Sequence, residues 1–100
     1  MTIDKIVNEQ ETIIKVDGWL DVNSAAELGS VTEALSKAQT IILDLEKVEY
    51  ISSAGLRQVV ALSKKSKELN ADFSVINVNK EVMSIFELTG LHKKISVTAL

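Results

Sequence analysis

The sequence contains no cysteine, no proline and a single histidine, His92. Without cysteine the chain cannot form a disulfide, bind zinc through thiolates or use a thiolate as a nucleophile. Eleven basic and fourteen acidic residues leave a net charge of −3. Because nucleic-acid binding depends on clustered positive charge, this balance argues against a nucleic-acid partner. The sequence therefore lacks much of what enzymes use for nucleophilic and metal chemistry.

Hydrophobic residues make up 46% of the 100 residues, which is typical of a soluble globular chain. This content and length predict one folded domain over residues 1–100. The apolar runs are only a few residues long, far short of the ~20 residues that cross a bilayer. The first residues show no basic stretch followed by an apolar one, so no signal peptide is expected. We therefore expect a cytoplasmic protein that binds no membrane.

Several short segments have the residue pattern of β-strands. The first runs through Asn8 and the second spans residues 12–16, where the β-branched residues end at the turn-forming pair Asp17-Gly18. These two strands are expected to pair as a hairpin. Two further strands are predicted at residues 73–78 and 95–97.

The most apolar of the predicted strands lies near the middle of the chain. Residues 40–45 form a nearly continuous apolar run, as expected of a strand buried on both faces of a sheet. Glu46-Lys47 breaks this run, and residues 48–51 extend or resume it.

Three helices are predicted from apolar spacing and capping residues. The first begins with a capping box formed by Ser24 and Glu27. Its apolar face recurs at helical spacing and comprises Leu28, Val31, Leu35 and Ala38. The second helix spans residues 54–69. The third is capped by Asn79 and stopped by Gly90.

The predicted elements follow one another in the order β-β-α-β-α-β-α-β. Strands that alternate with helices indicate βαβ units with right-handed crossovers. We therefore predict an α/β sandwich whose mixed, largely parallel sheet of about five strands is covered by three or more helices.

The segment over residues 48–57 joins a buried strand to the longest helix and contains Ser52, Ser53 and Gly55. In an open α/β sheet such a junction lies at the carboxyl edge, where ligands and partners usually bind. The free amides and the dipole of the helix favour an anion there, so a phosphate on a serine would be accommodated. Alternatively, the serine is an ordinary N-cap and the glycine only allows close packing. Spacing alone leaves both interpretations open.

Four motifs along the chain appear in an order that is typical of one family. They are GWLD at residues 18–21, ILDL with a following valine at 42–48, YISSAGL at 50–56 and VMSIFELTGL at 82–91. Together they resemble the STAS domain family, and specifically the bacterial anti-sigma factor antagonists. The resemblance extends over essentially the whole chain, and it implies the STAS-like form of the predicted fold.

The resemblance also implies a non-catalytic partner switch that controls transcription. In the family, the unphosphorylated antagonist binds an anti-sigma factor, which is also its serine kinase, and so frees the sigma factor. Phosphorylation blocks this binding, and a metal-dependent serine phosphatase restores it. The regulated serine lies in the motif Ser-x-Gly-Leu, which places it at Ser53. Ser52 stands where many antagonists have an acidic residue, and it is the second candidate. We expect no cofactor and a monomer or weak dimer.

The expected partner surface surrounds the same junction. Besides Asp21, it comprises Ser52, Ser53, Ala54, Gly55 and Arg57. The small Ala54 and Gly55 are expected to let the backbone of a partner come close. The match of Asp21 to the Leu-Asp motif of the family implies a contact with the partner. Asp21 could equally be an acidic residue at a helix N-terminus that complements the helix dipole, and both roles stay open. Trp19 would suit an interface if exposed, although a core position is the preferred prediction.

Two other functions compete with the partner switch. One is a STAS docking subunit of a transport or signalling assembly without phosphorylation switching. The other is an enzyme that uses Ser53 as a nucleophile, which we disfavour because His92 is the only histidine and the Ser-Ser-Ala-Gly context is not a nucleophile elbow. His92 itself is expected to be a solvated charge. Lys64, Lys65 and Lys67 are expected to form a solvated helix face, with contact to an acidic partner or a nucleotide phosphate as the alternative.

Overall fold

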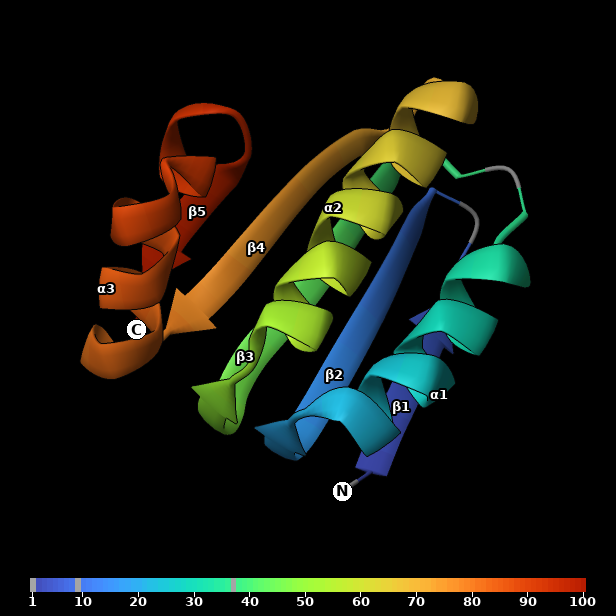
Figure 1. Ribbon diagram of the computed structural model, residues 1–100. Coiled ribbons are helices and arrows are strands. Elements are labelled where there is room, and N and C mark those ends of the chain that lie inside the picture. The colour runs from blue at the N-terminus through green and yellow to red at the C-terminus, as the bar shows by residue number, and fades with distance from the viewer. Residues whose placement is uncertain (1, 9, 37) are drawn as a thin grey trace.

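The computed structural model describes residues 2–8, 10–36 and 38–100. Strands and helices alternate in the predicted order (Figure 1). The elements are β1 (Thr2–Val7), β2 (Glu11–Leu20), α1 (Val22–Glu33), β3 (Thr40–Ile51), α2 (Ser53–Glu68), β4 (Asp72–Val78), α3 (Lys80–Thr89), the 3₁₀ turn η1 (Leu91–Lys93) and β5 (Ser96–Ala99).

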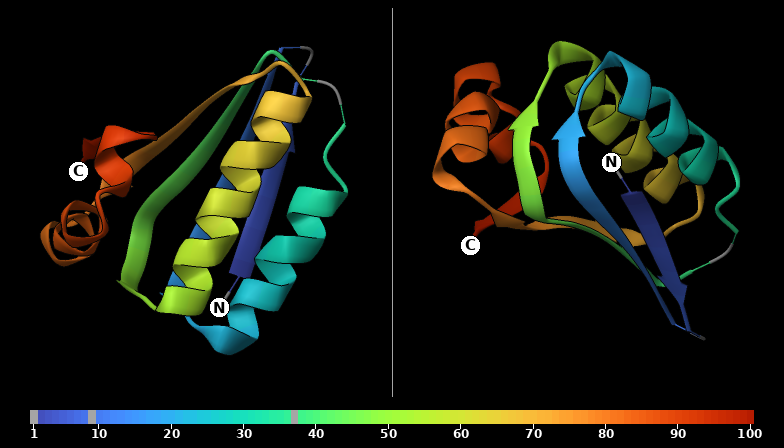
Figure 2. Two further views of the ribbon diagram at one scale, coloured as in Figure 1. Left: turned by 45° about the horizontal axis from the view of Figure 1, so that its top comes forward. Right: turned by 90° about the horizontal axis from the view of Figure 1, so that it is seen from below.

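The strands form one five-stranded mixed sheet in the order β1-β2-β3-β4-β5. The β1–β2 hairpin is antiparallel, and the other neighbouring pairs are parallel. The helices α1 and α2 lie side by side, with α1 against β2 and α2 against β3 and β4, while α3 lies apart from them and contacts β3 and η1 (Figure 2). The predicted α/β fold with a largely parallel sheet is confirmed.

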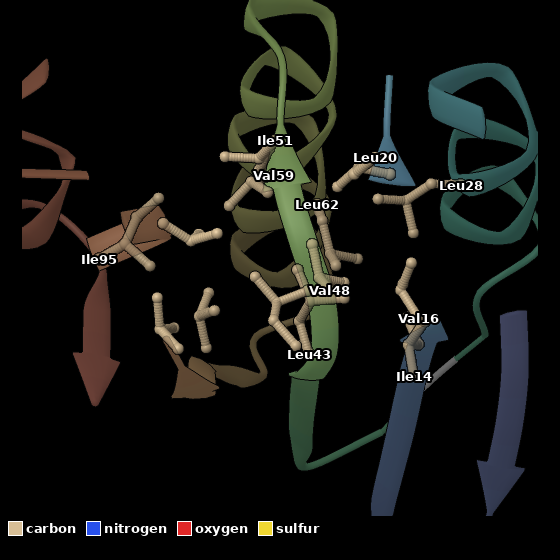
Figure 3. Close-up of a cluster of buried hydrophobic side chains, with 14 of the residues drawn as sticks. Ile14, Val16, Leu20, Leu28, Leu43, Val48, Ile51, Val59, Leu62 and Ile95 are labelled. Atoms are coloured by element: carbon tan, nitrogen blue, oxygen red, sulfur yellow. The ribbon is translucent and has the colours of Figure 1, made fainter. Parts of the chain in front are cut away.

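One hydrophobic core joins the sheet to its helices. Side chains from β2 and β3 meet those of α1 and α2, as Figure 3 shows for Ile14, Leu28, Leu43 and Val59. Phe86 of α3 belongs to the same cluster and is fully buried. This continuous core fixes where the carboxyl ends of β2 and β3 lie, and those ends form the candidate site.

Strand β2 is longer than the sequence predicted, because it continues through Asp17-Gly18 to Leu20. Strand β3 continues through Glu46-Lys47 to Ile51, so the predicted extension over residues 48–51 is confirmed. Both predicted interruptions fall where the parallel pairing of these strands shifts register, so they are irregularities inside a ladder and not its end. Gly18 adopts φ +104°, a conformation that glycine tolerates within the continuing strand.

The capping box of α1 lies three residues earlier than predicted. Asp21 is the N-cap, and its carboxylate accepts hydrogen bonds from the amides of Asn23 at 3.0 Å and Ser24 at 3.1 Å. The Ser24 hydroxyl oxygen accepts from the Asp21 amide at 2.8 Å, which completes the box. Ser24 is therefore the third helical residue and not the cap, so the pairing of Ser24 with Glu27 was wrong.

The end of α1 also differs from the prediction. The helix stops at Glu33, so Leu35 and Ala38 lie beyond it. Leu35 is nevertheless buried in the core, and Ala38 packs against that core. The prediction was too long because Leu35 and Ala38 continue the spacing of apolar residues that is typical of a helix. Both residues lie in the loop after α1, which returns to the core.

Candidate functional site

The junction between β3 and α2 is fixed by Ser52. This residue is the N-cap of α2, and its hydroxyl oxygen accepts a hydrogen bond from the Gly55 amide at 3.2 Å. Its own amide donates to the carbonyl oxygen of Leu20 at 2.9 Å, which ties the junction to the end of β2. Ser52 is half-buried, and its hydroxyl serves the helix start.

Ser53 occupies a different position although it is the next residue. It is the first residue of α2 and is exposed to solvent. The carbonyl of Ser52 accepts the first intrahelical bond, from the amide of Leu56 at 2.9 Å. Ser53 therefore presents its side chain at the start of a regular helix, at the carboxyl edge of the parallel strands.

Gly55 explains why the helix can start so close to the sheet. A Cβ atom at this buried position would lie 2.7 Å from the Leu20 carbonyl oxygen and 2.9 Å from Cγ1 of Ile51. Both neighbours belong to the ends of strands. Gly55 therefore serves the packing of α2 against β2 and β3, and its predicted contact with a partner stays a proposal. Ala54 beside it is half-buried.

Asp21 lies at the end of β2, next to the same junction. Hydrogen bonds from the Ser24 amide, from the Ser24 hydroxyl and from the Asn23 amide stabilise its carboxylate and hold its pKa below the usual value of 3.8. The helix-capping role of Asp21 is thus a property of the fold. Its predicted contact with a partner stays a proposal.

Trp19 is 56% exposed, so the predicted core position was wrong. It pairs in register with Tyr50 of β3, and the two rings lie 5.4 Å apart at an interplanar angle of 45°. The indole nitrogen of Trp19 donates to a Glu49 carboxylate oxygen at 3.2 Å. The next residue, Leu20, takes the buried position instead. The alternation of buried and exposed residues along β2, with Ile14 and Val16 buried and Lys15 and Asp17 exposed, continues to Leu20 and places Trp19 on the outer face.

The structure brings the ends of β2 and β3 together at one edge. A hollow of about 390 Å³ opens beside α1 and is lined by Gly18, Trp19, Asp21, Asn23, Ser24 and Glu27. The Ser24 hydroxyl has one proton, which it shares between the Trp19 carbonyl at 2.7 Å and the Asp21 carboxylate at 3.1 Å, and this ties the strand end to the start of the helix. Asp21, Ser52 and Ser53 therefore lie on connections that neighbouring strands position.

The family model for the STAS domain matches residues 2–99. The chain belongs to the STAS domain family. This STAS domain is 32% identical over 91 residues to a proposed anti-sigma factor antagonist, BtrV, of Bordetella bronchiseptica, an alignment that spans 79% of this chain and 77% of the relative. It is 29% identical to the anti-sigma-B factor antagonist of Staphylococcus aureus over 91% of this chain and 86% of that protein.

A solved structure supports the same assignment at the level of fold. The unphosphorylated anti-sigma factor antagonist SpoIIAA superposes with a TM-score of 0.82 at 18% identity, over 96% of this chain and 87% of the other. The predicted resemblance to STAS domains of the anti-sigma factor antagonist type is confirmed.

The remaining candidates occupy exposed positions of the STAS domain. Arg57 lies one helical turn after Ser53 and is exposed. His92 is exposed as well, and its Nδ1 atom lies 3.3 Å from the carbonyl oxygen of Phe86. Among the described residues, no group of three or more potential ligands is arranged to hold a metal ion. The helices in the described ranges are too short or too polar to span a membrane.

The sequence did not single out the pair Trp19–Tyr50 as a feature of the site. Both residues were visible, one in the GWLD motif and the other in the signature. Their juxtaposition depends on the parallel register of β2 and β3. The pair could have been expected only if the predicted strand over residues 12–16 had been extended to Leu20, beside the predicted extension over residues 48–51.

Proposed function

We propose that this STAS domain is an anti-sigma factor antagonist that acts by partner switching. Unphosphorylated, it binds an anti-sigma factor that is also a serine kinase, and the sigma factor is released to support transcription. Phosphorylation of Ser53 ends this binding, and a serine phosphatase restores it. The observation that carries the proposal is the exposed Ser53 at the first position of α2, within the Ser-x-Gly-Leu motif of a family member.

The surroundings of the two serines favour Ser53 as the modified residue. The Ser52 hydroxyl is already bonded to the Gly55 amide, and Ser52 is half-buried. A kinase acting on Ser52 would have to break this helix cap. Ser53 is exposed, so a kinase can reach it without disturbing the start of α2.

The chemistry of a phosphate at Ser53 fits a local switch. Phosphorylation adds about −1.5 to −2 charge and three acceptor oxygens at neutral pH. The start of a helix tolerates such a charge because of its dipole and free amides, so the fold need not change. At an interface, the same group adds bulk and a charge that is costly to desolvate. We therefore propose that phosphorylation releases the partner without rearranging the domain.

This function requires no catalysis by the STAS domain itself. A serine nucleophile needs a general base and a third group that orients it. Ser53 is proposed to act as a substrate of the kinase and not as a nucleophile. The candidate partners are accordingly proteins: the kinase, which is the anti-sigma factor, and the phosphatase.

The direct test is phosphosite mapping. The purified chain is incubated with ATP and a candidate anti-sigma factor serine kinase from the same genome, and intact mass and peptide fragmentation are then measured for the wild type, Ser53→Ala and Ser52→Ala. We expect one phosphate on Ser53, retained in Ser52→Ala and absent from Ser53→Ala. Stoichiometric phosphate on Ser53→Ala would move the site to another residue. Absence of phosphate from every form would favour a STAS docking subunit of a transport or signalling assembly.

Binding measurements complete the test. We expect Ser53→Ala to bind the anti-sigma factor as the wild type does, and Ser53→Asp to bind more weakly. Equal binding by both variants would show that charge at this position does not control the complex.

A further inference from the structure

A groove runs along α2 on the side that faces η1. Its volume is about 420 Å³, and its apolar wall comprises Leu56, Val60, Ala61 and Leu91. Two cations, Arg57 and Lys64, also line it, and its described lining residues include no carboxylate. The groove therefore combines apolar surface with positive charge, although the whole chain carries a net charge of −3.

The opposite side of α2 has a different character. The groove between α1 and α2 is also lined by Lys64, together with Lys65, but it contains the carboxylates of Glu33 and Glu68. Its charge is therefore mixed. Only the groove on the η1 side presents cations without a nearby acid among its described lining residues.

Ser53 and Arg57 lie four residues apart on α2, and both are exposed. Residues with this spacing are neighbours on a helix surface, with Cβ atoms about 5–6 Å apart. Long side chains on a helix lean toward its N-terminus, which directs the guanidinium of Arg57 toward Ser53. A phosphate on Ser53 would thus lie within reach of a planar group that forms two parallel hydrogen bonds to phosphate oxygens.

We propose that this groove receives an apolar segment of the anti-sigma factor that carries acidic side chains, and that a phosphate on Ser53 blocks it by pairing with Arg57. The proposal rests on the function proposed above and specifies its partner chemistry. Before phosphorylation, Arg57 and Lys64 attract the acidic segment while its apolar side chains enter the groove. After phosphorylation, Arg57 is paired and the new negative charge repels the same segment.

The pairing of Arg57 with the phosphate can be measured without any partner. Phosphoserine is incorporated at position 53 during synthesis, and the second protonation of the phosphate is followed by ³¹P NMR. Arg57 should lower the proton affinity of the phosphate by about two-fold or more. We expect this effect to disappear in Arg57→Gln and to persist in Lys67→Gln, which removes an exposed cation of α2 outside the groove. Identical titrations of all three forms would refute the pairing.

The groove is tested by affinity for the anti-sigma factor, measured calorimetrically with the unphosphorylated chain. The double variant Arg57→Gln/Lys64→Gln should bind about ten-fold more weakly and respond less to salt, whereas Lys67→Gln should change the affinity less than about two-fold. At the apolar wall, Val60→Glu should weaken binding more than Val60→Lys. This matched pair separates charge from a loss of packing, and circular dichroism verifies the fold of both.

The outcomes distinguish the groove from the proposed function. If the double variant and the Lys67→Gln control bind equally while phosphorylation still releases the partner, the groove proposal is wrong and the antagonist function stands. If the wild-type chain binds no anti-sigma factor, the antagonist function fails and the groove proposal fails with it. If phosphorylation weakens the wild type much more than Arg57→Gln, the pairing of Arg57 with the phosphate is supported as the release mechanism.

Discussion

The carbonyl oxygen of Leu20 accepts a hydrogen bond from the amide of Ser52 at 2.9 Å. This bond joins the last residue of β2 to the cap of α2. The same carbonyl oxygen lies 2.7 Å from the position of a Cβ atom on Gly55. The start of α2 therefore lies very close to the end of β2, and this close approach is possible because Gly55 has no Cβ atom.

We predict that Gly55→Ala destabilises the domain by about 1–3 kcal/mol, because its new methyl group meets backbone and buried side-chain atoms that have no room to move. Gly29→Ala is the control in α1. Its Cβ atom would meet the amide end of Gln58 at 3.1 Å, and that flexible side chain can move away. The control should therefore be neutral or gain up to about 1 kcal/mol from helix propensity. Urea unfolding measures both, and equal effects would contradict the close-approach explanation.

A second prediction separates the two serines by stability. Ser52→Ala removes the hydrogen bond to the Gly55 amide and should cost about 1 kcal/mol, as expected for the loss of an N-cap. Ser53→Ala alters an exposed first-turn position and should change stability by less than about 0.5 kcal/mol. Thermal unfolding followed by circular dichroism checks the pair. A larger loss in Ser53→Ala than in Ser52→Ala would reverse the assignment of the cap.

The sequence predicted the central and C-terminal parts of the fold well, because their signals are local. Asn79 caps α3 through a 2.8 Å bond from the Val82 amide, and Gly90 ends the helix at φ +74°. Such signals act over one turn of helix. The sequence also predicted a helix over residues 54–69 that begins directly after Ser53. In the structure Ser53 is the first residue of α2, so the predicted start is off by one residue.

The errors occurred where pairing between distant segments decides the outcome. Asp17-Gly18 has the composition of a turn, yet parallel pairing with β3 carries the strand past it. Trp19 was predicted in the core, but the alternation of buried and exposed residues along β2 places Leu20 inward and Trp19 outward once the strand is extended past Asp17-Gly18. The length of a ladder cannot be read from one strand alone.

The exposure of Trp19 leads to a third prediction. Trp19→Ala should cost only about 0.5–1.5 kcal/mol of stability through loss of the ring contact with Tyr50, far less than truncation of a buried tryptophan. Urea unfolding followed by far-UV circular dichroism measures this loss. If the aromatic pair belongs to the partner surface, the affinity for the anti-sigma factor should fall by about 30-fold or more, as for a binding hot spot.

The indole also provides a direct optical measurement, since Trp19 is the only tryptophan. Its emission should shift to shorter wavelength when the anti-sigma factor is added and the ring leaves water. Tyr50→Phe keeps the ring contact and serves as the control. Unchanged emission in a complex that calorimetry shows to be formed would exclude Trp19 from the interface.

The final prediction concerns acid stability through Asp21. Hydrogen bonds from the Ser24 amide and hydroxyl and from the Asn23 amide keep its pKa in the folded state below 3.8. The folded state therefore binds this proton less readily than the unfolded chain does. The resulting stabilisation is present above pH 3.8 and is lost as the pH falls through the lowered pKa of the folded state.

Asp21→Asn tests this mechanism because asparagine also caps helices but does not titrate. We expect the stability difference between wild type and Asp21→Asn to be constant at neutral pH. Below pH 3.8 it should shift in favour of the variant, because only the wild type then loses its charged cap. Urea unfolding at a series of pH values gives this difference directly, and contributions from the other acidic groups cancel in the comparison. A difference that stays constant throughout acidification would mean that the capping hydrogen bonds of Asp21 do not depend on its charge.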